Sequence, residues 1–132
     1  MISFIIPGKP IAQQRPRKGK GKKFYNAQSK IKIDWQWQAR VEYCGPILDG
    51  AVDLALEFVL EPPKSWPQYR KTYVVDNNRP VMTKPDLDNY VKWVLDCLQG
   101  VVYKDDAQVA RIIATKRYSE KALTRIEISE NL

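Results

Sequence analysis

The sequence contains no histidine, only two cysteines and no long apolar run. Without an imidazole the chain has no histidine general base and no usual zinc site, so carboxylates and a bound metal are left for any hydrolytic chemistry. Cys44 and Cys97 form no metal-binding or disulfide pattern. No segment is apolar enough to span a bilayer or to act as a secretory signal. We therefore expect a cytoplasmic protein with reduced thiols and no membrane partner.

Glycine-rich phosphate loops are also missing. The run from Gly19 to Lys22 alternates glycine with lysine, but it lacks the strand-to-helix context that a P-loop requires, and we expect no nucleotide cofactor. The 132 residues predict one domain, spanning 1–132, that is short enough for dimerisation to add to its stability.

Acidic residues are absent from residues 1–33, which carry nine of the 22 Lys and Arg side chains, while the whole chain has a formal charge of +7. Within this stretch, residues 9–23 contain proline and glycine but no apolar period. They predict a basic arm or loop that becomes ordered on a phosphate backbone, with a solvated tail as the alternative. The predicted DNA-binding residues are Lys9, Arg15, Arg17, Lys18, Lys20, Lys22 and Lys23.

Alternating apolar and polar residues predict strands at 2–6 and 52–60, and a final hairpin from 107–117 and 122–129. Residues 66–75 favour a short helix after a proline-rich insert. The order strand, helix, strand, insert, helix, strand, strand predicts an α+β domain with a small mixed sheet and two main helices.

Residues 26–43 alternate like a strand, but their length and their helix-forming side chains favour a helix, capped by Asn26 or Ser29. The strand interpretation stays open on sequence alone. As a helix, the segment places Ile31, Trp35, Ala39 and Tyr43 on one face.

Five of the 15 acidic residues lie within 84–106. Asp86 and Asp88 follow Pro85 and are two residues apart, so on an extended backbone both side chains project to the same side. Carboxylates brought together repel one another and form an oxygen-rich site that binds a divalent cation such as Mg²⁺. The competing interpretation is that an Asp at the start of a helix only caps it.

The apolar spacing from Leu87 to Leu98 predicts an amphipathic helix that begins beside this pair. Lys92 lies one turn beyond Asp88, where its ammonium could steady a carboxylate or a phosphate oxygen, although an ordinary i,i+4 ion pair has the same spacing. After the helix, the chain delivers Asp105 and Asp106 to a returning strand. We expect three or four of the carboxylates to meet at one point.

The acidic region resembles the RusA family of Holliday junction resolvases. The resemblance rests on Lys84-Pro85-Asp86-Leu87-Asp88-Asn89, Lys92, Asp96-Cys97-Leu98 and Asp105-Asp106-Ala107-Gln108-Val109, with Ile6-Pro7-Gly8-Lys9-Pro10 and Arg15-Pro16-Arg17 similar to the basic start of the family. It implies that residues 84–109 form a metal-site core.

Carried over residue by residue, the resemblance implies that Asp86, Asp88 and Asp106 bind Mg²⁺, with Mn²⁺ as the alternative ion, and that Lys92 assists cleavage. Asp105 is then a ligand or an outer neighbour of the metal. Asp96, one turn past Lys92, is expected to orient the lysine.

The resemblance also implies a small dimer that binds branched DNA by shape and resolves four-way junctions with paired nicks in recombination and repair. Trp35, Trp37 and Tyr43 supply more aromatic surface than a short helix needs to bury, which favours a homodimer interface. The alternative function is a non-catalytic DNA- or RNA-binding module in which the acids are structural.

Overall fold

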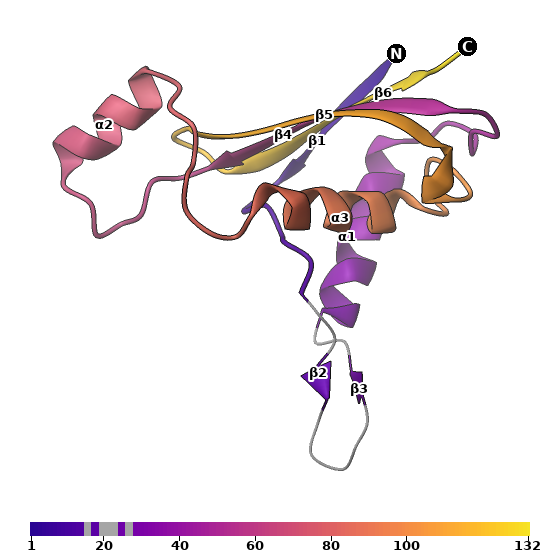
Figure 1. Ribbon diagram of the computed structural model, residues 1–132, viewed down its shortest axis with the longest axis horizontal. Coiled ribbons are helices and arrows are strands. Elements are labelled where there is room, and N and C mark those ends of the chain that lie inside the picture. The colour runs from indigo at the N-terminus through magenta and orange to yellow at the C-terminus, as the bar shows by residue number, and fades with distance from the viewer. Residues whose placement is uncertain (15–16, 19–23, 26–27) are drawn as a thin grey trace.

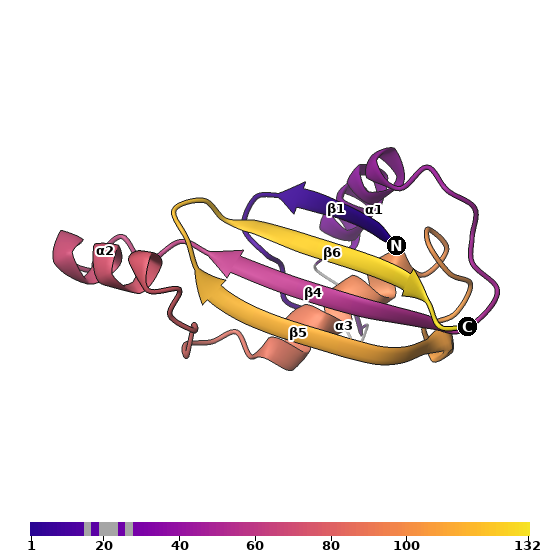
Figure 2. The same ribbon diagram turned by 90° about the horizontal axis from the view of Figure 1, so that it is seen from above.

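A four-stranded mixed sheet forms the centre of the molecule. The computed structural model describes residues 1–14, 17–18, 24–25 and 28–132. The strands are β1 (Ile2–Pro7), β4 (Val52–Leu60), β5 (Val109–Tyr118) and β6 (Leu123–Glu130). Their order across the sheet is β1-β6-β4-β5, with β4 parallel to β5 and every other neighbouring pair antiparallel (Figure 2).

Two helices, α1 (Ser29–Glu42) and α3 (Leu87–Leu98), cover one face of this sheet (Figures 1 and 2). The alternating side chains of β4 explain the layering, because Leu54, Leu56 and Phe58 face the helices and are almost fully buried. On the opposite face Glu57 accepts ion pairs from Arg117 at 3.0 Å and Arg125 at 3.5 Å. The predicted α+β domain with a mixed sheet is confirmed.

The segment 26–43 is helical, as its composition favoured. Its first turn follows Gln28, which makes no side-chain capping bond, so Ser29 is not the cap and Asn26 lies outside the described residues. Trp35, Ala39 and Tyr43 are buried in the core, whereas Ile31, at the outer end of that face, is exposed.

The burial of α1 corrects the predicted dimer surface. Trp35 and Tyr43 are each only 4% exposed within a single chain, while Trp37 is 60% exposed. Two of the three aromatic side chains therefore belong to the core of the chain and supply no surface to a partner.

The predicted hairpin of the last two strands is wrong. β5 and β6 both exist, but β4 lies between them and pairs with each. The connection crosses the end of β4, where the Ser119 N–H donates to the Leu60 carbonyl at 2.9 Å. The apolar strand β4 gains by this arrangement, because a central position satisfies both of its backbone edges.

The insert carries helix α2 (Gln68–Asp76), which projects from one end of the sheet (Figure 1). Trp66 fastens it there, since its ring lies 5.5 Å from the Tyr118 ring and under the Arg70 guanidinium at 3.6 Å. No helix in the described ranges is both long and apolar enough to cross a membrane.

In the basic arm, β2 (Arg17–Lys18) pairs antiparallel with β3 (Phe24–Tyr25). This short ladder projects away from the sheet on the side of the helices (Figure 1). The arm, residues 9–23, was expected to lack regular structure, and the ladder corrects that expectation for Arg17 and Lys18. The predicted binding residues Arg15, Lys20, Lys22 and Lys23 lie outside the described residues.

Candidate active site

Asp86 and Asp88 lie together at the start of α3. Asp86 is the N-cap residue, with extended backbone angles of φ −71° and ψ 150°, and its side chain makes no capping hydrogen bond. Asp88 stands in the first turn, and both residues are exposed. The amino end of a helix favours negative charge, so the fold tolerates two neighbouring carboxylates here without engaging them in local bonds.

Lys92 belongs to the same end of the helix. Its Nζ lies 4.0 Å from the Asp88 carboxylate, and the two side chains are 63% and 68% exposed. An exposed pair at this distance contributes little to stability. Both groups therefore remain available to a ligand, and three of the four residues predicted to be catalytic are close together.

The second acidic pair is held by a short turn after α3. Asp105 caps the 3₁₀ turn η1 (Asp106–Gln108), and its carboxylate accepts from the Ala107 N–H at 2.9 Å. Neighbouring side chains on an extended strand would face opposite ways, but the strand begins only at Val109, so these two carboxyl groups do not. A hydrogen bond with Asp105 raises the pKa of Asp106, and burial and the charges of Asp105 and Asp96 raise it further.

Gln108 is the residue that shapes this turn. Its Oε1 accepts from the backbone N–H groups of Lys104 and Asp105 at 2.9 and 3.1 Å. Its Nε2 donates to the Leu48 and Gly50 carbonyls at 2.8 and 2.9 Å. No role was predicted for Gln108 from the sequence. Its fixed place in the run Asp105-Asp106-Ala107-Gln108-Val109 was the signal that could have indicated one.

The two acidic pairs occupy opposite ends of α3. The Asp106 N–H donates to the Gln99 side chain at 3.3 Å, just past the last turn of the helix. Asp88 stands in the first turn, and a helix of 12 residues is about 18 Å long. Among the described residues no three acidic or cysteine side chains are close enough to hold a metal ion. The expectation that the carboxylates meet at one point is wrong within a single chain.

Asp96 is directed to the second acidic pair. Its charge contributes to the raised pKa values of Asp106 and Tyr103. Lys92 instead forms its ion pair with Asp88, one turn back along the helix. The role of Asp96 in orienting the lysine stays a prediction, and its charge also acts on Asp106.

The base of the basic arm is fastened beside the first acidic pair. The Gln13 N–H donates to the Asn89 carbonyl of α3 at 2.9 Å. Gln28, which is buried, accepts from the Gln14 N–H and donates to the Ala12 carbonyl, both at 2.8 Å. These contacts explain how a chain segment far from α3 in sequence reaches the acids. The sequence alone did not predict that Gln13 and Gln28 hold the arm base in place.

A cavity of about 370 Å³ lies at this junction. Its walls come from the arm base and from the start of α3 on either side of the acids, and they comprise residues 9–14, Gln28, Pro85 and Asn89. The first acidic pair therefore borders a concave surface at the base of the arm.

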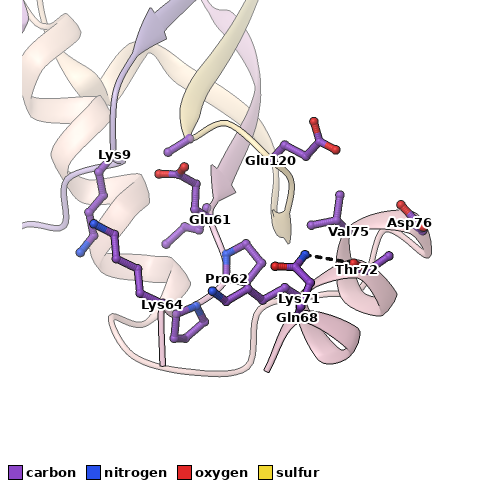
Figure 3. A pocket seen from close by; sticks show the side chains of 13 residues that line it. Lys9, Glu61, Pro62, Lys64, Gln68, Lys71, Thr72, Val75, Asp76 and Glu120 are labelled. Atoms are coloured by element: carbon purple, nitrogen blue, oxygen red, sulfur yellow. Dashed lines mark hydrogen bonds between the residues drawn. The ribbon is translucent and has the colours of Figure 1, made fainter. Parts of the chain in front are cut away.

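A second cavity, of about 680 Å³, lies between α2 and the end of the sheet (Figure 3). Its lysines and acids are equal in number, namely Lys9, Lys64 and Lys71 with Glu61, Asp76 and Glu120. Because these charges balance, the cavity lacks the positive potential that attracts a nucleic acid. The start of α3, with Asp86 and Asp88, therefore remains the better candidate for the active site.

Comparisons with known proteins show the family of this chain. The family model described as endodeoxyribonuclease RusA matches residues 7–129. The uncharacterized protein YqaN of Bacillus subtilis (strain 168) is 36% identical over 137 aligned positions, which cover 98% of this chain and 96% of that protein. The family match spans the arm base, both acidic pairs and strands β4 and β5, and the chain belongs to the RusA family of endodeoxyribonucleases.

Proposed function

We propose that this protein is a Mg²⁺-dependent endonuclease that resolves four-way DNA junctions in recombination and repair by paired nicks. The observation that carries the proposal is the exposed acidic pair Asp86 and Asp88, with Lys92 beside it, at the point where the basic arm is fastened to α3. Membership in a family of endodeoxyribonucleases supports the same conclusion.

The residues at the start of α3 fit a magnesium ion. Mg²⁺ is usually held by one or two carboxylates, several waters and the phosphates of the substrate. Asp86 makes no capping bond, and Asp88 has an ammonium at 4.0 Å, so both carboxylates are available as ligands. When bound, the ion supplies polarisation of the scissile phosphate and a lower pKa for the attacking water. Mn²⁺ has similar ligand preferences and is the alternative ion.

The side chains around the acids have distinct tasks. Lys92 places a positive charge beside Asp88 that can neutralise charge developing on the phosphate oxygens in the transition state. Lys9 and the rest of the basic arm bind the phosphate backbone by charge, and the Gln13–Asn89 bond keeps the arm base next to the acids. DNA held by the arm is thereby directed to the carboxylates.

Asp106 is proposed to act at the site of a second copy of the chain. Within one chain it is separated from Asp88 by the length of α3. A twofold axis that brings the end of one α3 near the start of the other would let the partner's Asp106 complete the ligand set twice. The same homodimer provides two cutting sites, which a junction needs if two strands are to be nicked.

The test compares a mobile four-way junction, a linear duplex of the same sequence and a single-stranded RNA, each with Mg²⁺ or with chelator. We expect paired nicks in the junction only when Mg²⁺ is present, and weaker binding of the duplex and the RNA. Junction binding without nicking at any Mg²⁺ concentration would instead support the non-catalytic module.

A further inference from the structure

The outer edge of β5 is a backbone edge without a partner. Among the strands that the structure describes, β5 is an edge strand of the sheet, with β4 as its only neighbouring strand in the order β1-β6-β4-β5, and it is ten residues long. In the part of the chain that the structure describes, its outer side is bonded only near the carboxyl end, where residues 79–81 meet it. An exposed edge of this length is a template for pairing with another strand.

The hydrogen bonds at the end of β5 show which of its residues face outward. The Tyr118 N–H donates outward to the Arg79 carbonyl at 3.1 Å, and the Lys116 carbonyl accepts from the Val81 N–H at 3.2 Å. The neighbouring Ser119 N–H points inward, to Leu60 of β4. Because backbone groups alternate along a strand, Ile112 and Ala114 also direct their N–H and C=O groups outward. The alternation stops short of Ala110, where the register between β4 and β5 shifts by one residue.

We infer that β5 pairs antiparallel with β5 of a second copy, with Ile112 opposite the partner's Ile112. This inference rests on the proposed function, because it assigns the surface of the proposed homodimer. Ile112 then pairs with itself across the twofold axis and exchanges both of its N–H···O bonds, while Ala114 lies opposite the partner's Ala110. The two sheets then join into one continuous sheet.

The side chains at the edge agree with this register. Ile112 lies on the helix-covered face of the sheet, in register with the buried Leu54, yet it is 39% exposed. Ile113 on the other face is 51% exposed. The register places Arg111 opposite the partner's Ile113, so the cations of the strand do not face one another, whereas like charges directly opposite would destabilise the pairing.

The same pairing addresses the separation of the acids. Lys116, near the carboxyl end of β5, donates to the Thr83 and Pro85 carbonyls at 2.8 and 2.9 Å, which ties the residue before Asp86 to this end of the strand. Asp106 precedes the amino end of β5. An antiparallel partner sets the amino end of one strand beside the carboxyl end of the other, so the partner's Asp106 comes to the Asp86 side. A parallel partner would not do this.

Cysteine cross-linking tests the register. Ile112→Cys in a Cys44→Ser background should form a disulfide-linked dimer on mild oxidation, because paired Cα atoms about 5.5 Å apart are within disulfide range. The matched control is Ile5→Cys on β1, since Ile5 is 40% exposed and Ile112 is 39% exposed. Cys97 stays unreactive, because it is buried and burial raises the pKa of its thiol to about 12. Equal cross-linking of both variants would overturn the inference.

A proline at the edge provides an independent test. Ala114→Pro removes an outward N–H, and an edge strand tolerates such a proline because the lost donor faced solvent. The variant should keep the circular dichroism spectrum of the wild type but sediment as a monomer at concentrations where the wild type is a dimer. A folded Ala114→Pro protein that remains dimeric would overturn the inference.

The two proposals fail in different ways. A wild-type protein that dimerises and nicks junctions in pairs, while Ile112→Cys does not cross-link, overturns the β5 interface and leaves the resolvase function standing. A protein that cross-links at Ile112 but never cuts DNA supports the interface and refutes the nuclease.

Discussion

The Gln13 N–H donates to the carbonyl oxygen of Asn89 at 2.9 Å, and this bond joins the basic arm to the first turn of α3. Asn89 is the residue after Asp88. The arm and the acidic pair are therefore parts of one local structure, although more than 60 residues separate them in sequence. We therefore expect that a phosphate backbone bound by the arm base would lie next to the carboxylates without any rearrangement of the fold.

Neutralising single carboxylates should abolish cleavage and spare binding. Asp86→Asn, Asp88→Asn and Asp106→Asn each keep the size of the side chain and remove the charge that holds the metal. Groups that merely support a metal ligand are worth about 10- to 100-fold, so loss of a ligand should reduce nicking by at least about 100-fold. Asp49→Asn is the control, because Asp49 is an exposed carboxylate that pairs with Lys104 outside the site. Nicking assays that find full activity in Asp88→Asn would refute the site.

Lys92→Ala should slow cleavage without changing the Mg²⁺ concentration that gives half the maximal rate. The lysine is proposed to stabilise the transition state, and removal of such a group costs about 100- to 1,000-fold in rate. Lys104→Ala, which breaks the exposed ion pair with Asp49, should leave the rate unchanged. A higher Mg²⁺ requirement with a normal rate at saturation would show that Lys92 acts on the metal site instead.

The core elements of the fold could be predicted because their signal is local. The alternation of apolar and polar residues in β4 and the apolar spacing in α3 each identify the buried face of the element without reference to the rest of the chain. The order of the strands is not local. Two consecutive strands with a short connection favour a hairpin, and only the competition for the central position of the sheet places β4 between β5 and β6.

The candidate site divides in the same way. The sequence placed Asp86, Asp88 and Lys92 together because they share one helix end. Where Asp106 comes to lie depends on the turn after α3, and that turn is set by bonds from Gln108 to residues about 60 positions away. Hydrogen bonds between residues so far apart leave no periodic pattern in the sequence. The motif was recognisable, but its two halves could not be located relative to one another.

Gln28→Ala should destabilise the fold and loosen the arm. Gln28 is 6% exposed and bonds the backbone of Gln14 and Ala12. Its loss removes two hydrogen bonds to partly buried backbone groups, which costs about 1–3 kcal/mol in total. Urea denaturation should show the lost stability, and junction affinity should fall although no charge has changed. Gln38→Ala, on the exposed side of α1, is the control. Wild-type stability and affinity would show that the tether is unimportant.

Removing the arm's lysines should weaken junction binding through its salt dependence. Alanine at Lys18, Lys20, Lys22 and Lys23 should lower the slope of log affinity against log salt by about one unit for each phosphate that the arm no longer neutralises. Nicking at saturating protein should survive, because the acids are unchanged. Lys104→Ala with Lys121→Ala tests whether any exposed lysine has this effect. A slope equal to that of the wild type would identify the arm as a solvated tail.

Two inactive variants should restore activity when they are mixed. If each site combines Asp86 and Asp88 of one chain with the partner's Asp106, a heterodimer of Asp88→Asn and Asp106→Asn collects both defects in one site and leaves the other site intact. Co-refolded chains should then nick one strand of a cruciform plasmid but seldom linearise it, while either variant alone does neither. Sites built within single chains would give no activity in the mixture, because every site would carry a defect. The control mixes Asp86→Asn with Asp88→Asn, which places one defect in each site of the heterodimer and should stay inactive.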